Sequence, residues 1–463
     1  MKKTHLIFIL LITSYCFAQN KQILYNFTDV PQSLMTNPGS DVTYKWYFGV
    51  PLVSGIYASA GSTGFSAYDL FADNGVNFNT KLRNVLYSTT RNDRVAINEQ
   101  LEIFNGGFRI GTEEKRMYLS FGMYQEFDLL GYVPKDLAIL AIDGNKDYLG
   151  KTFNLGDLNG KAELLSVFHI GLHKNINENL IVGVRGKIYS SIYNATSTKN
   201  AGFVYTIPSN NAFYEQVIYS DLQLNTSGMD KYDDSGYQED IAGDIKKRML
   251  LGGNLGLGFD VGLTYYPQKN IQLTASAIDI GFIKHTKDVE NVRYKGYYEY
   301  EGIIPNFTNV NQAGNAYQEF KDAIPLDTLH TKYTTWRPAK FNSSIQYSFG
   351  EERYDDGEDC NCQGSSSETI YKNAVGAQLF VMTTPRSPMV AFTTYYRRAF
   401  FKGLQMKATY TLDSYSYTNL GLGLSSQLGP LNFYAMADNL LEYTDVSKAN
   451  SLSFQLGFNF IFK

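Results

Sequence analysis

Apolar and polar residues alternate strictly along the last part of the chain. From Leu452 to Phe462 every even-numbered residue is apolar, while the odd-numbered positions are polar or small, with Ile461 as the exception. Because successive side chains of a β-strand point to opposite faces, this pattern predicts a strand with one apolar and one polar face. An apolar face that ends in an aromatic residue beside the chain terminus is typical of a membrane-barrel strand, with lipid outside and a polar lumen inside.

The same alternation recurs along the rest of the chain. It is as regular from Leu251 to Tyr265, where Leu, Phe and Val alternate with Gly, Asn, Asp and Thr. We predict about fourteen strands, or roughly twelve to sixteen if one hairpin is merged or split. The predicted strands are 46–58, 101–111, 116–127, 162–174, 179–193, 251–265, 271–282, 339–350, 371–382, 389–400, 403–413, 418–428, 431–438 and 451–462.

The gaps between these strands alternate between short and long. The short gaps include 112–115, 175–178, 267–270, 400–403 and 429–430, and the long gaps are 59–99, 128–161, 194–249 and 283–338. Bacterial single-chain barrels have an even number of strands, short periplasmic turns and longer extracellular loops. The gaps follow this rule if both ends of the barrel are periplasmic, with 351–370 as an oversized periplasmic gap. We therefore predict an all-β, antiparallel transmembrane β-barrel over residues 45–463.

The N-terminus has the pattern of a secretory signal peptide. Lys2 and Lys3 precede the apolar run 6–12, and a short exit segment ending in the small residue Ala18 follows. The apolar run is too short to cross a bilayer as a helix. We predict that residues 1–18 are a signal peptide cleaved after Ala18 and that the protein is exported to the cell outer membrane. Residues 19–44 do not alternate and lie either in the periplasm or in the lumen as a plug.

Composition supports many strands and excludes some function classes. The 463 residues include 36 Tyr, 30 Phe and 40 Gly, and aromatic residues make up 15%. Such a bias is typical of strands with aromatic girdles at the membrane interfaces. A mean hydropathy of −0.25 argues against a helical membrane protein. The net charge of −4 comes without a basic block, so we expect no nucleic-acid partner.

Charged residues on the polar faces of the predicted strands are the candidate site. The candidates are Arg185, Lys187, Asp260, Arg397, Lys407 and Asp438, together with Gly256 and Gly258 of the strand 251–265. Charges inside a barrel can set a polar path or hold a plug, whereas a solvated lumen with paired charges is the simpler interpretation. The glycine track Gly252, Gly256, Gly258 and Gly262 indicates either the close approach of residues 20–44 or a sharply curved wall.

The sequence carries no recognisable catalytic motif, and we predict that the protein is not an enzyme. Cys360 and Cys362 lie in an acidic loop, where they could bind a soft metal or form a small disulfide ring. A structural zinc site needs four ligands, so a solvated loop is the better interpretation and we expect no cofactor. His169 and His173 are interpreted as lumen residues, and residues 230–244 as a solvated outer loop.

Several short stretches, in this order along the chain, resemble known families: 36–40, 48–55, 64–70, 182–187, 256–262, 279–282, 428–434 and 437–440. The chain resembles an uncharacterised domain-of-unknown-function family of exported barrels from bacteria of the Bacteroidetes type. It is also similar to the FadL-type outer-membrane barrels, and more distantly to the PorV and PorP/SprF barrels of type IX secretion and gliding. The FadL likeness implies a fourteen-strand outer-membrane barrel but no particular solute. The type IX likeness implies a barrel that binds a partner.

Two functional hypotheses follow. The first is a FadL-like barrel for passage or capture of a small solute, with hydrophobic solutes as the first candidates. The alternative is a non-transporting barrel that serves as partner or anchor subunit of a secretion or gliding complex. In both cases the expected partners are outer-membrane lipid and, during assembly, the barrel-insertion machinery, and in the second also a secretion-system protein.

Overall fold

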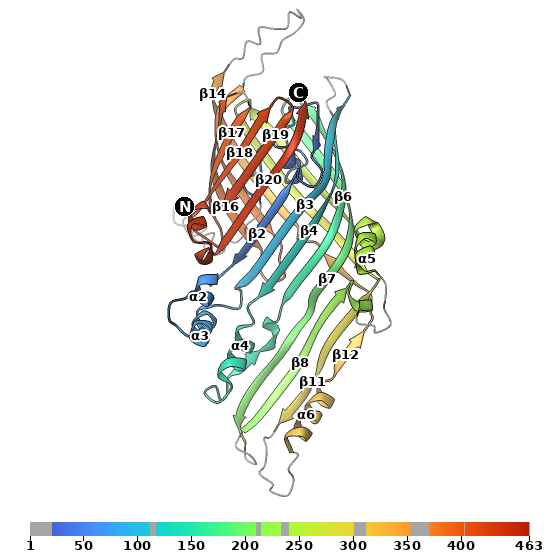
Figure 1. Cartoon of the computed structure of the whole chain (residues 1–463), viewed down its shortest axis with the longest axis vertical. Coiled ribbons are helices and arrows are strands. Elements are labelled where there is room, and N and C mark those ends of the chain that lie inside the picture. The colour runs from blue at the N-terminus through green and yellow to red at the C-terminus, as the bar shows by residue number, and fades with distance from the viewer. Residues whose placement is uncertain are drawn as a thin grey trace, which may run out of the picture.

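The computed structural model describes residues 21–111, 117–209, 214–232, 240–300, 312–352, 370–401 and 403–462. The predicted signal peptide, Cys360 and Cys362 lie outside these ranges. The described strands close into the predicted antiparallel barrel of 14 strands (Figure 1). Each strand is hydrogen-bonded to the next along the chain, and the last strand pairs with the first.

One position of the ring is shared by two short strands. β1 (Trp46–Gly49) and β2 (Ile56–Ser62) both pair with β3 (Arg94–Ile110) and with β20 (Ser451–Phe462). The prediction of one continuous strand over 46–58 is wrong at 50–55, where Pro51 lacks the N–H that the ladder needs. The other positions are β4 (Met117–Tyr132), β6 (Gly160–Asn177), β7 (Leu180–Pro208), β9 (Asn254–Gln268), β10 (Ile271–His285), β14 (Lys340–Glu352), β15 (Ile370–Met382), β16 (Met389–Phe401), β17 (Leu404–Leu412), β18 (Asn419–Leu428) and β19 (Leu431–Asp438).

The two faces of the wall differ as the alternation predicts. On β9, Leu255, Leu257 and Phe259 are exposed outside, whereas Asp260 and Thr264 are buried inside. The outside of the barrel is therefore an apolar belt, which suits the hydrocarbon core of a membrane. The chain's C-terminus and the tight β6–β7, β9–β10 and β18–β19 turns lie at one end of the barrel, which we assign to the periplasm.

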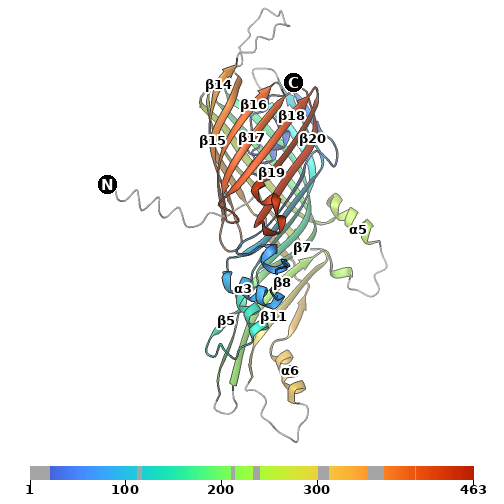
Figure 2. The same ribbon diagram turned by 60° about the vertical axis from the view of Figure 1, so that its left-hand side comes forward.

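The opposite, extracellular end carries a sheet that leaves the barrel. β7 runs past the wall and pairs there with β5 (Thr152–Asn154) and β8 (Tyr214–Ser227). β8 continues the sheet to β11 (Val289–Tyr300) and β12 (Leu326–Leu329) (Figures 1 and 2). We call β5, β7 from Lys199 onward, β8, β11 and β12 the extracellular sheet. The prediction that 194–249 and 283–338 are only loops is wrong, because these polar stretches satisfy their backbone groups by pairing with one another.

Short helices lie in the connections at the extracellular end. They are α2 (Ala67–Phe71), α3 (Phe78–Ser88), α4 (Lys135–Asp143), η3 (Leu155–Asp157), η4 (Asp230–Tyr232), α5 (Ile241–Lys247), η5 (Arg248–Gly252), α6 (Gln312–Ala323), η6 (Leu440–Thr444) and η7 (Val446–Lys448), and the short strand β13 (Tyr333–Trp336) precedes β14. α4 packs on one face of the extracellular sheet, where Ile139, Phe153 and Val204 are buried together. Among the described residues, no helix is long and apolar enough to cross a membrane.

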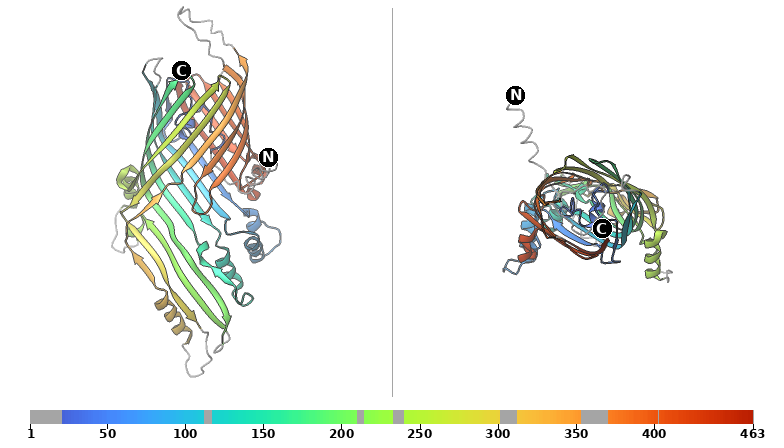
Figure 3. Two further views of the ribbon diagram at one scale, coloured as in Figure 1. Left: turned by 180° about the vertical axis from the view of Figure 1, so that it is seen from behind. Right: turned by 90° about the horizontal axis from the view of Figure 1, so that it is seen from above.

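Residues 21–44 lie inside the barrel, which Figure 3 shows from above. They contain one short helix, η1 (Pro31–Met35), and are otherwise irregular. Leu24, Phe27 and Val30 form a core with Tyr434 and Met436 of β19. This stretch, which we call the lumen segment, therefore has its own apolar core against one wall of an otherwise polar lumen.

Candidate functional site

Hydrogen bonds tie the lumen segment to the surrounding strands. The amide of Gln32 donates to the backbone oxygen of Ser54 at 2.9 Å, to Glu102 Oε2 at 3.0 Å and to Asn459 Oδ1 at 2.9 Å. These partners come from β3, from β20 and from the turn between β1 and β2. One side chain of the lumen segment thus holds three parts of the wall together.

On the opposite wall the contacts are made by the backbone of the segment. Ser276 Oγ donates to Thr36 O at 2.7 Å, and Thr264 Oγ1 donates to Gly39 O at 2.8 Å. The strand glycines allow this approach, because a Cβ on Gly183 would lie 2.0 Å from Pro38 O. The wall of β7 and β9 is thus shaped to receive the turn 36–40.

The predicted glycine track only partly serves this contact. A Cβ on Gly262 would lie 2.0 Å from Asn37 Oδ1, so this glycine does face the lumen segment. Gly258 instead makes room for the ring of Tyr189, whose hydroxyl would lie 2.3 Å from an added Cβ. A Cβ on Gly256 would lie 2.2 Å from the backbone oxygen of Phe282. The hypothesis that the segment packs along the whole track is therefore wrong for Gly256 and Gly258, which accommodate the wall itself.

Three of the predicted site residues come together beside the segment. Arg185 pairs with Asp260 at 3.3 Å and also donates to the backbone oxygen of Leu34. Lys187 pairs with Asp260 at 2.9 Å and with Asp279 at 2.5 Å. These charges are fully buried, so their pairing offsets the cost of removing them from water.

The sequence reasoning missed Asp279. It has a φ of 60° and sits at a register shift of β10 between Ala277 and Ile280. Strict alternation from Ser276 would point it at lipid, but the bulge turns it inward. A charged side chain on the lipid face would cost about 2–4 kcal/mol for a cation and less for an acid. An Asp at a position that strict alternation assigns to the lipid face therefore indicates a bulge, and this signal was present in the sequence.

A second set of charges crosses the lumen nearer the extracellular end. Arg337, between β13 and β14, pairs with Glu126 at 2.9 Å and Asp128 at 3.2 Å, both on β4, and with Glu163 on β6. The neighbours of β14 in the wall are β10 and β15, not β4. The ion pairs of Arg337 therefore span the lumen and do not join neighbouring strands. We call Arg337 and its three carboxylates the charged layer.

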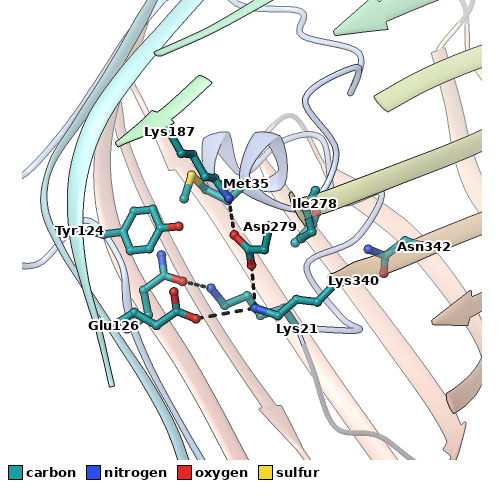
Figure 4. A pocket seen from close by; sticks show the side chains of 11 residues that line it. Lys21, Met35, Tyr124, Glu126, Lys187, Ile278, Asp279, Lys340 and Asn342 are labelled. Carbon is teal, nitrogen blue, oxygen red and sulfur yellow. Dashed lines mark hydrogen bonds and ion pairs between the residues drawn. The ribbon is translucent and has the colours of Figure 1, made fainter. Parts of the chain in front are cut away.

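The charged layer continues into the cluster around Asp279 (Figure 4). Lys340 bridges Glu126 at 3.6 Å and Asp279 at 2.9 Å. A void of about 30 Å³ lies among these groups, and Lys21 of the lumen segment also lines it. The void is large enough for one or two water molecules. A continuous chain of ion pairs therefore links the two walls, and the hydrogen bond from Arg185 to Leu34 O ties this chain to the lumen segment.

The remaining predicted residues lie on other strands and do not join this cluster. Lys407 on β17 donates to Tyr25 O at 2.5 Å, and its ammonium lies 4.1 Å from the ring centre of Tyr395. Asp438 on β19 accepts from Ser453 Oγ at 2.9 Å. Arg397 is half-buried on the inner face of β16. Of these, Lys407 binds the lumen segment directly.

An apolar cavity lies just outside the charged layer, at the extracellular mouth. This cavity has a volume of about 280 Å³ and is lined by Ala96, Leu130, Pro338, Met382, Met389 and Tyr415, among others. Asp128, Lys161 and Arg337 are its charged lining residues, and uncharged polar side chains such as Asn98 also line it. Trp336 lies at its rim. We call this space the mouth cavity.

A buried turn holds one side of the mouth cavity in place. Asp413, between β17 and β18, accepts hydrogen bonds from the backbone N–H groups of Tyr415 and Ser416, both at 2.9 Å, and from the amide of Asn419 at 3.3 Å. Burial raises the pKa of Asp413 to about 7, because it disfavours the charged form more than these donors favour it. The turn positions the ring of Tyr415 over the cavity.

Within the described ranges, no group of three or more His, Cys, Asp or Glu side chains could hold a metal ion. His169 and His173 are buried on the inner face of β6, where His173 stacks on Tyr118 with ring centres 5.4 Å apart. We assign them a packing role.

Comparison with known proteins identifies a family and finds solved structures of low similarity. A family model described as "Family of unknown function (DUF5723)" matches residues 38–438. No curated protein matches the chain. The Ralstonia pickettii toluene transporter TbuX has a TM-score of 0.42 at 9% identity, covering 98% of this chain and 100% of its own. A Pseudomonas aeruginosa FadL homologue has a TM-score of 0.42 at 11% identity, covering 95% and 96%. The P. putida toluene transporter TodX has a TM-score of 0.38 at 8% identity, covering 97% and 96%.

Proposed function

Because the chain belongs to the family of unknown function DUF5723, which brings no solute with it, we propose a function from the lumen itself. The barrel captures a small apolar solute in the mouth cavity and passes it inward across the outer membrane when the lumen segment yields.

The mouth cavity is the observation that carries this proposal. Its volume of about 280 Å³ is close to the lower end of small-molecule sites, which span about 300–1,000 Å³. Its walls are mostly apolar, and the polar lining consists of three charged and four uncharged polar residues: Asp128, Lys161, Arg337, Ser59, Asn98, Thr383 and Thr384. Burying apolar surface there gains about 25 cal/mol per Å². A single aromatic ring or a short alkyl chain suits such a site.

Passage beyond the cavity must be gated. The charged layer crosses the lumen directly behind the cavity, and the lumen segment fills the space behind that layer. An apolar solute cannot enter a layer of paired charges without separating them, which is costly in a buried site. The segment is held by its apolar core around Leu24 and by individual hydrogen bonds of about 0.5–1.5 kcal/mol each. It contributes no strand to the barrel ladder, so it is the part that can move while the wall stays closed.

Uptake of a hydrophobic probe tests the proposal. Ala96→Phe fills the mouth cavity from the inner face of β3, whereas Val95→Phe places the same ring on the outer face, away from the cavity. The probe is N-phenylnaphthylamine, whose fluorescence rises as it enters intact cells that express each variant. We expect wild type and Val95→Phe to accelerate probe entry relative to cells that do not express the protein. Ala96→Phe should lose that acceleration. Equal rates for all three, with normal heat-modifiable barrel bands, refute capture in the cavity.

A second function is favoured by the extracellular sheet. One of its faces carries Phe203, which stacks with Tyr205 at 5.7 Å and contacts Tyr219 at 5.6 Å, and Tyr297 on the same face is 53% exposed. An ordered aromatic sheet face outside the membrane fits a partner-binding barrel, such as a subunit of a secretion or gliding complex. A stoichiometric partner that co-purifies in mild detergent and is lost in Tyr297→Ala, with probe entry absent from wild type, supports this alternative.

A further inference from the structure

We propose that two apolar flanges on opposite sides of the barrel rest in the outer leaflet of the membrane, and that one of them, the α5 flange, binds its phosphorylated headgroups. The α5 flange is residues 240–252, between the extracellular sheet and β9. The second flange is residues 66–78 together with 440–448. This inference does not depend on the proposed solute.

The α5 flange projects sideways from the wall (Figures 1 and 2). Ile241 and Ile245, one helical turn apart, are exposed together with Leu250 and Leu251. Leu250 is 58% exposed. The chain runs from Leu251 directly into β9, whose outward leucines belong to the lipid-facing belt. The apolar surface of the flange therefore continues an established lipid interface.

The α5 flange is fixed at its base. Arg248 is buried there and donates to Gly228 O at 2.6 Å and to Ile192 O at 3.2 Å. It also pairs with Asp288. These bonds anchor the flange to β7 and to the turn before β11, so its apolar side chains are held out from the wall.

The second flange has the same character. Phe71 is 73% exposed and Leu441 is 58% exposed. The rings of Phe71 and Phe78 lie 6.2 Å apart, and the ammonium of Lys448 lies 4.8 Å from the ring centre of Tyr68, which joins η7 to α2. The segment 440–448 begins where β19 ends and leads into β20, at the extracellular edge of the belt.

The two flanges stand at a similar height on opposite sides of the barrel (Figures 1 and 3). Exposed apolar clusters of this kind mark protein or membrane contacts. Their position at the edge of the belt favours lipid, and Lys246 and Lys247 beside Ile245 add positive charge where headgroup phosphates lie. Each such lysine strengthens attachment to an anionic surface by roughly fivefold.

Spin-label accessibility tests this proposal. In a Cys360→Ser/Cys362→Ser background, nitroxide labels are placed by Ile245→Cys and Leu441→Cys, with Leu257→Cys as the lipid-facing control and Tyr297→Cys as the water-facing control. The protein is reconstituted in phosphatidylglycerol vesicles. We expect the labels at 245 and 441 to collide with oxygen and to be shielded from an aqueous nickel chelate, as at 257. Nickel access as high as at 297 overturns the proposal, as does shielding from both reagents, which indicates a second protein copy.

The lysines are tested separately. Lys246→Glu combined with Lys247→Glu should raise nickel access at position 245 severalfold in phosphatidylglycerol vesicles but change it little in phosphatidylcholine vesicles. Equal access in both lipids refutes the headgroup contact. The label at 441, on the other flange, should be unaffected and is the internal control.

Discussion

Gly183→Ala should detach the lumen segment from its wall. The added Cβ would lie 2.0 Å from Pro38 O and 2.5 Å from the nitrogen of Gly39, and both are backbone atoms that cannot rotate away. The turn must therefore move by about 1.5 Å to reach a normal contact distance of roughly 3.5 Å.

The size of the effect follows from what that movement breaks. Overpacking costs about 1–3 kcal/mol. The hydrogen bonds from Ser276 to Thr36 and from Thr264 to Gly39 are also lost, at about 0.5–1.5 kcal/mol each. The sum is about 2–6 kcal/mol against the docked segment, enough to shift its population by at least an order of magnitude. The barrel itself should stay closed, because its ladder is unchanged.

Planar-bilayer conductance and limited proteolysis of residues 21–44 measure this release. The matched control is Gly186→Ala on the same strand, where an added Cβ meets nothing within 4 Å. We expect Gly183→Ala to open more often and to be cut faster within 21–44, and Gly186→Ala to behave as wild type. If both variants match wild type in both assays, the lumen segment is not held where the structure places it.

Three further outcomes are expected. Arg337→Met leaves the buried carboxylates of Glu126 and Glu163 and the half-buried one of Asp128 without their shared cation. It should lower the free energy of unfolding by about 3–5 kcal/mol, seen as an earlier urea midpoint than for the exposed control Arg398→Met. Val261→Arg, on the outer face near the middle of β9, should cost about 2–4 kcal/mol and slow barrel insertion in a heat-modifiability assay. The raised pKa of Asp413 means that the folded state binds a proton more tightly than the unfolded state. Stability should therefore fall as pH rises from about 4 to about 7, and Asp413→Asn should flatten that dependence in urea titrations at several pH values.

Local alternation was enough to predict the barrel but not its contents. Residues 255–265 alone show which side chains of β9 face lipid and which face the lumen, because lipid and lumen favour opposite residue types at adjacent positions. Asp279 was not predicted as a lumen residue because a bulge exchanges the inner and outer faces of the strand at this point. A strict alternation of two does not allow for a bulge. Arg337 lies just before the predicted strand 339–350, in a stretch expected to be outer loop.

The extracellular sheet shows the same limit. Its strands pair residues far apart in the chain, such as Phe203 with Tyr219 and Tyr219 with Tyr297, and such pairing is not visible in any single window. Composition pointed to polar loops, yet tertiary pairing decided the structure. The charged layer is likewise a property of strands that meet only when the barrel closes.

Fluorescence of Trp336 tests the central claim most directly. The chain has two tryptophans, so Trp46→Phe leaves only Trp336, at the rim of the mouth cavity. Titration with bromobenzene should quench this fluorescence saturably, and Ala96→Phe in the same background should abolish the saturation. Trp336→Phe, which leaves Trp46 at the periplasmic edge, should show only the linear quenching of a solute dissolved in lipid. Linear and equal quenching of both tryptophans, unchanged by Ala96→Phe, would contradict solute capture in the mouth cavity.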